Sequence, residues 1–500
     1  MPGDEAVGEQ SLAPVLPDAP DVGFRSVLAR AGHYFLGTVF SSLVAFATLP
    51  FTTRILGPAN YGVFALGATV VGLGATLATL GATFVLNNRY PAAGAEERRR
   101  LISTLSLTAF AAATTWSIFA LAAFATLRNV WTPLGQVSLR GLALMLVTSI
   151  PACLWIIAID VMILVGRSGV FLAATVLQTI ASSAGTLFTL YVIKLGGTAL
   201  FVGASCANLV AFFAALFVLR GQLSLRLGLR QRERLDQWRF LYAQAFDSAQ
   251  PLFERALLTR FAGFTQLGRY SHSQSYRGVI FQSMNAVSRG AWPTTITEAH
   301  EPAGRFQRTG ATWSAVQLGI TAGGIPLVLF GTALTGFLTN GKLTGAASFF
   351  GPWIVLVLLQ SSGRAAGGIL YVLGQAKVVA NLNLKANVSV FVAGAILIPL
   401  AGPVGAAGAL IAQAIVYRIL LVARARRYRE VPFQDSWVVI GGALITALTL
   451  VRRYVAHTVD SRLAVLFIAE AVCLAAGAPV VRSAWRFVVP QLQLARERAR

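Results

Sequence analysis

The sequence has little charge, little histidine and little cysteine. Only 12% of its 500 residues are charged, whereas 56% are hydrophobic. A soluble protein of this length carries about twice that charged fraction. The three cysteines, Cys153, Cys206 and Cys473, lie inside apolar runs at unrelated spacings. They indicate neither a disulfide framework nor a metal site, so we expect no metal and no cofactor.

Several catalytic motifs are also missing from the sequence. It contains no Walker A pattern, so the chain is not expected to hydrolyse ATP itself. No group of side chains has the spacing of a metal site or a catalytic triad. The breaks between apolar runs are too short for a large catalytic domain outside the membrane. We therefore predict that the protein is not an enzyme.

Long apolar runs dominate what is present, for example residues 33–51, 101–127 and 378–400. A helix of about 20 residues crosses the hydrocarbon core of a bilayer, because each residue adds 1.5 Å. The runs predict an all-α polytopic membrane protein with about 14 transmembrane helices. The approximate limits are 33–53, 62–86, 101–127, 141–165, 169–193, 199–219, 240–260, 268–290, 309–338, 347–373, 378–400, 403–423, 437–451 and 463–481.

The net charge of +22 has two readings. A basic chain can bind nucleic acid, but the cytoplasmic loops of membrane proteins also collect Lys and Arg. Most basic residues here fall in alternate loops, including Arg98–Arg100, 220–239 and 424–429, and in both termini. We therefore predict cytoplasmic termini and no nucleic-acid partner.

One turn is written twice in the sequence. "RILGPANYGVF" at 54–64 recurs as "RFAGFTQLGRY" at 260–270, and looser matches follow at nearly the same offset. The matched residues are Arg54, Gly57, Gly62 and Phe64 in the first copy, and Arg260, Gly263, Gly268 and Tyr270 in the second. The repeat contains six helices, so both copies have the same orientation. It predicts two pseudo-symmetric six-helix bundles, followed by a two-helix hairpin.

These patterns give a domain organisation. We predict a disordered cytoplasmic N-terminus over 1–21, an N-terminal bundle over 22–220, a basic cytoplasmic linker over 221–239, a C-terminal bundle over 240–424, an extra transmembrane hairpin over 435–482 and a basic cytoplasmic tail over 483–500.

Polar side chains inside the spans indicate a substrate path between the bundles, since ionisable groups at membrane depth face protein or water. Asp247 and Glu254 lie seven residues apart on one helix face and are candidates for ion coupling. The next span carries a polar stripe that includes Arg277. The candidates for substrate binding are Arg277, Arg364, Gln274, Gln282, Asn285, Arg54 and Arg260.

The roles of these residues have alternatives. Glu254 and Arg277 lie at similar depths, so they can form either a static pair between helices or separate coupling and substrate sites. Arg54 and Arg260, at the repeated turns, either anchor the helices at the lipid headgroups or contact the substrate. Cations outnumber acids among these candidates, which favours an anionic substrate.

Four segments carry a resemblance to a known family: "RILGPANYGVFALGATV", "LGATFVLNNRYPA", "RFAGFTQLGRYSHSQSY" and "AGPVGAAGALIAQAI". Over about residues 24–430 the chain resembles the polysaccharide transport family. These are Wzx-type flippases of lipid-linked oligosaccharides in the MOP superfamily, which also includes MurJ and the MATE exporters.

The resemblance implies a flippase that moves a polyprenyl-pyrophosphate-linked oligosaccharide to the periplasmic leaflet of the bacterial inner membrane by alternating access. It also implies a basic cavity lined by helices one, two, seven and eight. The implied partners are the lipid-linked oligosaccharide, membrane lipids, and polysaccharide polymerase and export machinery. This chain departs from some relatives because residues 35–86 carry no charge except Arg54.

Two other functions are weighed against this one. A MATE-like exporter of cationic compounds would have the same fold but would need an acidic cavity. A membrane enzyme acting on the same lipid would need a long outer loop with catalytic side chains, and the sequence has none.

Overall fold

The structure is a computed structural model that describes residues 24–79, 81–90, 93–165, 167–224, 228, 231–300, 306–373, 375–428, 436–454, 458 and 462–479. These residues form helices and turns, without a strand. Eleven of their helical stretches are long and apolar enough to cross a membrane. The predicted all-α polytopic fold is therefore confirmed. The predicted N-terminal segment 1–21 and tail 483–500 lie outside the described residues.

The first half of the chain forms helices close to the predicted spans. They are α1 (Phe24–Ile55), α2 (Pro58–Thr79), α3 (Ala82–Arg89), α4 (Ala95–Val130), α5 (Leu139–Ala152), α6 (Leu154–Val165), α7 (Ser168–Tyr191) and α8 (Thr198–Leu219). Two predicted spans are interrupted. The span 62–86 breaks before α3, where Gly81 takes a left-handed φ of 73°. The span 141–165 breaks at Cys153, which follows Pro151.

The second half contains two very long helical elements. It consists of α9 (Gln231–His300), α10 (Gln307–Thr339), α11 (Phe350–Val372), α12 (Ala376–Tyr428), α13 (Ser436–Tyr454) and a further apolar helix, Arg462–Pro479. Helix α9 begins at Gln231, so part of the predicted linker 221–239 is helical.

Both long elements are folded in two. Helix α9 has a non-helical residue at Gly263 (φ 77°), and α12 has one at Gly402 (φ 56°). Hydrogen bonds then join residues on opposite sides of each kink, such as Gln274 to Glu254 in α9 and Gln413 to Asn387 in α12. Each element is therefore an antiparallel pair of arms. Only glycine adopts these positive φ values without a steric cost.

The folded elements account for the predicted number of spans. The apolar stretch Val378–Arg426 supplies two crossings rather than one. The two arms of α9 are too polar to be among the eleven candidate spans. With these arms included, the described helices agree with the prediction of about 14 crossings.

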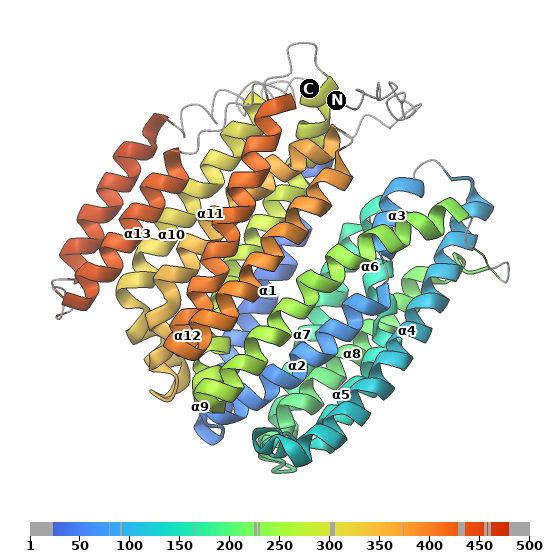
Figure 1. Ribbon diagram of the computed structural model, residues 1–500, viewed down its shortest axis with the longest axis horizontal. Coiled ribbons are helices and arrows are strands. Elements are labelled where there is room, and N and C mark those ends of the chain that lie inside the picture. The colour runs from blue at the N-terminus through green and yellow to red at the C-terminus, as the bar shows by residue number, and fades with distance from the viewer. Residues whose placement is uncertain are drawn as a thin grey trace, which may run out of the picture.

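The helices gather into two groups (Figure 1). Helices α3 to α8 lie together on one side, α10 to α13 lie on the other, and α9 runs between them. Helix α2 packs mainly against α9, whereas α1 packs against both α7 and α9. Segments from the two halves of the sequence therefore meet in the middle of the molecule.

The two copies of the repeated turn contact each other. A Cβ atom on Gly62 would collide with the carbonyl oxygen of Phe264, and one on Gly268 would collide with that of Pro58. Pro58 and Phe264 are themselves equivalent positions in the repeat. The contact is thus reciprocal, as a two-fold relation between the halves requires. We call the end of the molecule that carries these turns the turn end.

A second contact joins the halves at the turn end. Asn340, which follows α10, donates from Nδ2 to the Pro50 carbonyl at 2.8 Å and lies 3.3 Å from Thr53 Oγ1. Lys342 Nζ donates to the Arg54 carbonyl at 2.9 Å. The C-terminal ends of α1 and α10 are therefore held together by hydrogen bonds.

Candidate functional site

Arg255 forms the centre of a polar cluster between the halves. It lies on the first arm of α9 and points at α2, where it donates to the Ala65 carbonyl at 2.8 Å and to the Thr69 hydroxyl. It also donates to Gln274 Oε1 on the second arm at 3.1 Å. Helix α2 carries no charge of its own. The cation next to α2 is therefore supplied by α9.

Glu254 lies beside Arg255 but points toward the second arm. Its side chain is only 5% exposed, and it accepts a hydrogen bond from Gln274 Nε2 at 3.1 Å. Arg255 and Arg277 are near enough to attract its carboxylate electrostatically. Glu254 and Arg277 do not form a direct ion pair, and Gln274 instead joins Glu254 to Arg255.

Arg277 is held by an aromatic ring. Its guanidinium carbon lies 5.5 Å from the centroid of the Trp353 ring on α11, an arrangement typical of a cation–π contact. Trp353 is fixed in turn by a 2.8 Å hydrogen bond from its Nε1 to Ser273 Oγ. Arg277 is half-buried and makes no hydrogen bond to the part of the chain that the structure describes. Its N–H donors are thus available to a ligand.

Asp247 has a separate set of partners in the C-terminal half. Its two carboxylate oxygens accept from Asn383 Nδ2 at 2.7 Å and from Asn387 Nδ2 at 2.6 Å. Behind them, Gln413 donates to Asn387 Oδ1 and, at 3.4 Å, to Gln250 Oε1. The first arm of α9 is therefore joined to both arms of α12. Asp247 itself is exposed.

Arg364 on α11 joins a third group. It donates to Asn285 Oδ1 on the second arm of α9 and lies 4.3 Å from the centroid of the Phe281 ring. Asn285 in turn donates to Gln282 Oε1 at 3.3 Å. The structure therefore brings together three of the predicted binding residues, Arg364, Asn285 and Gln282.

Arg54 and Arg260 lie apart from these groups. Both side chains are exposed, and the Arg54 guanidinium lies 5.9 Å from the centroid of the neighbouring Phe51 ring. They sit at the turn end, on the two copies of the repeated turn. The two predicted roles of Arg54 and Arg260, anchoring at the lipid headgroups and contacting the substrate, both stay predictions.

Several residues that complete these groups were not among those predicted from the sequence: Thr69, Trp353, Asn383, Asn387 and Gln413. Asn383 and Asn387 had a detectable signal, since two amides spaced four residues apart share one face of their helix. Thr69 had none, because threonine in a membrane helix is unremarkable until an arginine from another helix reaches it.

A comparison with protein families identifies the family of this chain. The family described as polysaccharide biosynthesis protein matches residues 27–299, which is more than half of the sequence. The chain belongs to this family. No curated protein matches it.

Several solved structures share the fold of this chain. A lipid II flippase MurJ in an inward closed conformation has a TM-score of 0.65 at 10% identity, covering 91% of this chain and 99% of its own. A MATE transporter of Vibrio cholerae has a TM-score of 0.55 at 12% identity, covering 82% and 98%. An inward-facing multidrug resistance MATE family transporter of the MOP superfamily has 0.57 at 13% identity, covering 86% and 99%.

These comparisons confirm the resemblance that the sequence motifs indicated. At such low identities the structural likeness shows a shared fold, and this family member therefore has the fold of MOP transporters. The expectation that the chain is not an enzyme agrees with its family and with these neighbours, which are transporters and flippases.

Proposed function

We propose that this protein is a flippase that moves a polyprenyl-pyrophosphate-linked oligosaccharide from the cytoplasmic to the periplasmic leaflet of the bacterial inner membrane, for surface or exopolysaccharide synthesis. The observation that carries the proposal is Arg277, a half-buried cation with free hydrogen-bond donors beside the Glu254–Arg255–Gln274 cluster. An arginine fork of this kind suits the oxygens of a pyrophosphate.

The substrate's chemistry explains why cations and amides are placed between the halves. A sugar diphosphate cannot cross hydrocarbon unaided, because its charges lose their water. Arginine and amide side chains along a path can replace that water. The polyprenyl tail needs no such path, since it is soluble in the bilayer. In this proposal the head passes between the halves while the tail stays in lipid.

Arg277 and Arg364 lie at different depths along the second arm of α9. Asn285, the partner of Arg364, is eight residues farther from Gly263 than Arg277 is. Eight helical residues correspond to about 12 Å. Arg364 and Arg277 therefore provide two successive binding positions for an anionic head group. In our proposed orientation, with both termini cytoplasmic, Arg364 is the position nearer the cytoplasm.

For coupling to an ion gradient we propose Asp247, with Glu254 as the second candidate. Asp247 is exposed and lies among amide side chains that connect the arms of α9 and α12. Binding of a proton or a small cation would change the charge that the two asparagines contact. That change would alter the fit between α9 and α12. Glu254, in contrast, is enclosed by the Arg255 cluster, which suits a structural part in the substrate site.

The alternative function is a MATE-like exporter, which the shared fold also allows. An exporter of cationic compounds would have to accept them beside Arg255, Arg277 and Arg364. The charge of these groups favours the anionic substrate. Polysaccharide polymerase and export machinery are the partners we propose for the flippase.

The test of the proposal is deletion of the gene, followed by analysis of surface polysaccharide and of lipid-linked repeat units. We expect the polysaccharide to be lost and repeat units to accumulate facing the cytoplasm. Normal polysaccharide without accumulation would overturn the proposal. Accumulated export substrates of another chemical class, with normal polysaccharide, would favour the exporter.

The site is tested by complementing the deletion with Arg277→Glu. We expect this variant to reach the membrane and fail to restore polysaccharide, because the reversed charge repels the pyrophosphate. Arg128→Glu is the matched control, since Arg128 is an exposed arginine at the far end of α4. Full rescue by Arg277→Glu would remove Arg277 from the site.

A further inference from the structure

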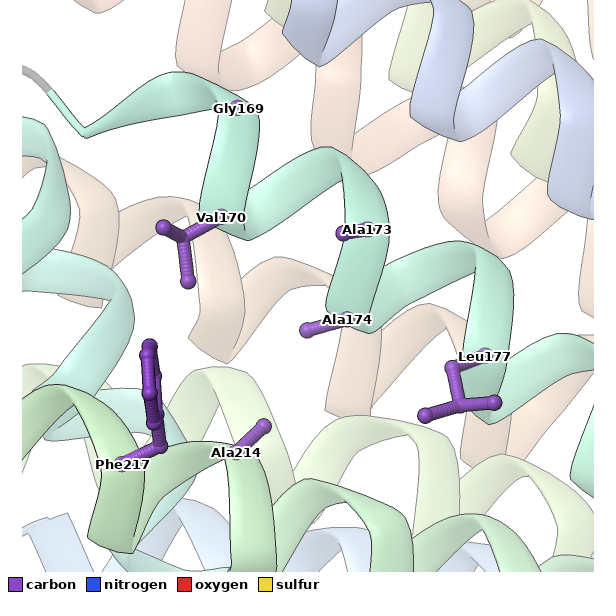
Figure 2. A pocket seen from close by; sticks show the side chains of 7 residues that line it. All are labelled: Gly169, Val170, Ala173, Ala174, Leu177, Ala214 and Phe217. Atoms are coloured by element: carbon purple, nitrogen blue, oxygen red, sulfur yellow. The ribbon is translucent and has the colours of Figure 1, made fainter.

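An apolar pocket lies between α7 and α8 (Figure 2), and none of the residues that line it belongs to the polar groups described above. Its volume is about 360 Å³, within the range of roughly 300–1,000 Å³ that is common for ligand sites. Small residues on α7, Gly169, Ala173 and Ala174, leave the space. Leu177 on α7 and Phe217 on α8 stand at its borders.

The pocket opens toward lipid. Its bordering residues Leu177 and Phe217 are 55% and 50% exposed, and Phe213, one turn before Phe217 on α8, is 64% exposed. Large apolar side chains with this exposure, on helices long enough to cross a membrane, are typical of a surface in contact with hydrocarbon. A hydrocarbon chain can therefore enter the pocket from the bilayer.

One end of the pocket is basic. Arg220 directly follows α8, and its guanidinium carbon lies 4.2 Å from the centroid of the Phe217 ring. Arg167 directly precedes α7, two residues before Gly169, and it is exposed. Within the described part of the chain, neither side chain has a hydrogen bond or an ion pair. Two arginines with free donors thus stand where the apolar pocket reaches the end of its helices.

We propose that this pocket binds an anionic glycerophospholipid, with one acyl chain between α7 and α8 and the phosphate at Arg220 and Arg167. The pairing of an apolar hollow with a basic end is the charge pattern that such a lipid complements. A zwitterionic lipid would place an ammonium group beside the arginines. In our proposed orientation the lipid belongs to the cytoplasmic leaflet, and it is a resident ligand rather than the transported one.

A polyprenyl chain is the competing occupant. The pocket is bounded by Leu177 after little more than two turns of α7, which suits part of an acyl chain better than a long polyprenyl chain. It is formed by α7 and α8 alone, so it does not lie between the two halves. A substrate tail that follows its head group would have no reason to stop here.

The test uses the purified full-length protein and native mass spectrometry, with phosphatidylglycerol and phosphatidylcholine of identical chains as probes. We expect phosphatidylglycerol to be retained preferentially. Arg220→Gln should lower its retention about fivefold, the factor that corresponds to one juxtamembrane cation. Arg128→Gln, which removes an exposed arginine far from the pocket, should leave it unchanged.

A variant that fills the pocket, with a control variant outside it, tests whether an acyl chain binds between α7 and α8. Ala173→Leu should lower the retention of both lipids, whereas Ala122→Leu, at an exposed alanine of α4, should not. Gel filtration of each variant shows that it is folded. Equal phosphatidylglycerol retention by wild type, Arg220→Gln and Ala173→Leu would overturn the proposal. The proposal would also be overturned if a polyprenyl phosphate displaced phosphatidylglycerol from the wild type but did not bind to Ala173→Leu. Lipid retention does not depend on transport. The lipid proposal can therefore be contradicted while the gene-deletion test supports the flippase, and the flippase can be contradicted while the lipid proposal is supported.

Discussion

At the scale of single residues, the protein places its buried charges where several neutral groups can satisfy them. Among the residues that the structure describes, Arg255 has no direct carboxylate partner and instead donates to a carbonyl, a hydroxyl and an amide. Glu254 likewise accepts from an amide. An ion that depends on neutral dipoles can exchange one of them for a ligand more readily than it could break a tight ion pair. This arrangement suits a site that must bind and release an anion.

The hydroxyl of Thr69 should stabilise the folded protein through Arg255. A hydrogen bond to a charged group contributes about 1.5–3 kcal/mol, so Thr69→Val should lower the free energy of unfolding by roughly that amount. Thr76→Val on the same helix is the control, because the Thr76 hydroxyl is exposed and bonds only to the Gly72 carbonyl. Thermal unfolding in detergent measures both. Equal midpoints for the two variants would contradict the assignment.

Asp247 should matter for coupling rather than for folding. Asp247→Asn removes the titratable charge while keeping the size of the side chain between Asn383 and Asn387. In proteoliposomes we expect the variant to move substrate at the same rate with and without an imposed ion gradient. Glu470→Gln, which neutralises a carboxylate in the extra helix Arg462–Pro479, should keep the gradient dependence. A gradient response in Asp247→Asn equal to wild type would exclude Asp247 as the coupling group.

At the scale of helices, most of the structure could be predicted from apolar runs alone. The spans in the first half begin and end near their predicted limits because hydrophobic length is the dominant signal for a membrane helix. The breaks inside 62–86 and 141–165 were not predicted. Both fall within continuous apolar sequence, where a single glycine or proline changes the backbone direction without changing the hydropathy.

The polar contacts were harder to predict than the helices. The sequence showed that Glu254 and Arg277 lie at similar depths on neighbouring helices. It could not show the rotation of each helix about its axis. That rotation puts Gln274 between Glu254 and Arg255 and turns Arg277 toward Trp353.

The close crossing of α2 and α9 should not tolerate a methyl group. Gly62→Ala places a Cβ against the Phe264 carbonyl, and overpacking of this kind costs about 1–3 kcal/mol. We expect a lower unfolding midpoint and weaker complementation of the deletion. Gly72→Ala on the same helix is the control, since a Cβ there meets no other atom within 4 Å.

The reciprocal variant sharpens this test. Gly268→Ala should behave like Gly62→Ala, because it collides with the equivalent carbonyl, that of Pro58. One widening of the crossing relieves both collisions, so the double variant should cost less than the sum of the single variants. Additive costs would mean that the two glycines act independently.

At the scale of the whole molecule, the halves are held together at the turn end by the glycine crossing and by the hydrogen bonds between α1 and α10. The alternating access that belongs to our proposed function would require these contacts to open and close. The sequence repeat predicted that the two halves would correspond. It did not predict that Gly62 and Gly268 would themselves form the contact between the halves.

A covalent link at the turn end should therefore stop transport. In a variant without the native cysteines, Thr53→Cys with Asn340→Cys replaces two side chains that lie 3.3 Å apart across the halves. We expect the oxidised protein to be inactive in proteoliposomes and to recover on reduction. Thr48→Cys with Ser183→Cys, whose hydroxyls are 3.1 Å apart within one half, should stay active when linked. Unchanged transport by the linked Thr53–Asn340 pair would show that this end does not open.

The reciprocal glycine contact also bears on how such a chain arises. In a homodimer with a two-fold axis, one mutation to glycine opens room on both sides of the interface at once, because each subunit presents the same residue to the other. In this chain the same contact is encoded at two separate codons, Gly62 and Gly268. A mutation at one of these codons therefore changes only one side of the contact, so each half can change alone. The sequence is polar after Gly268 and apolar after Gly62, as such independence allows.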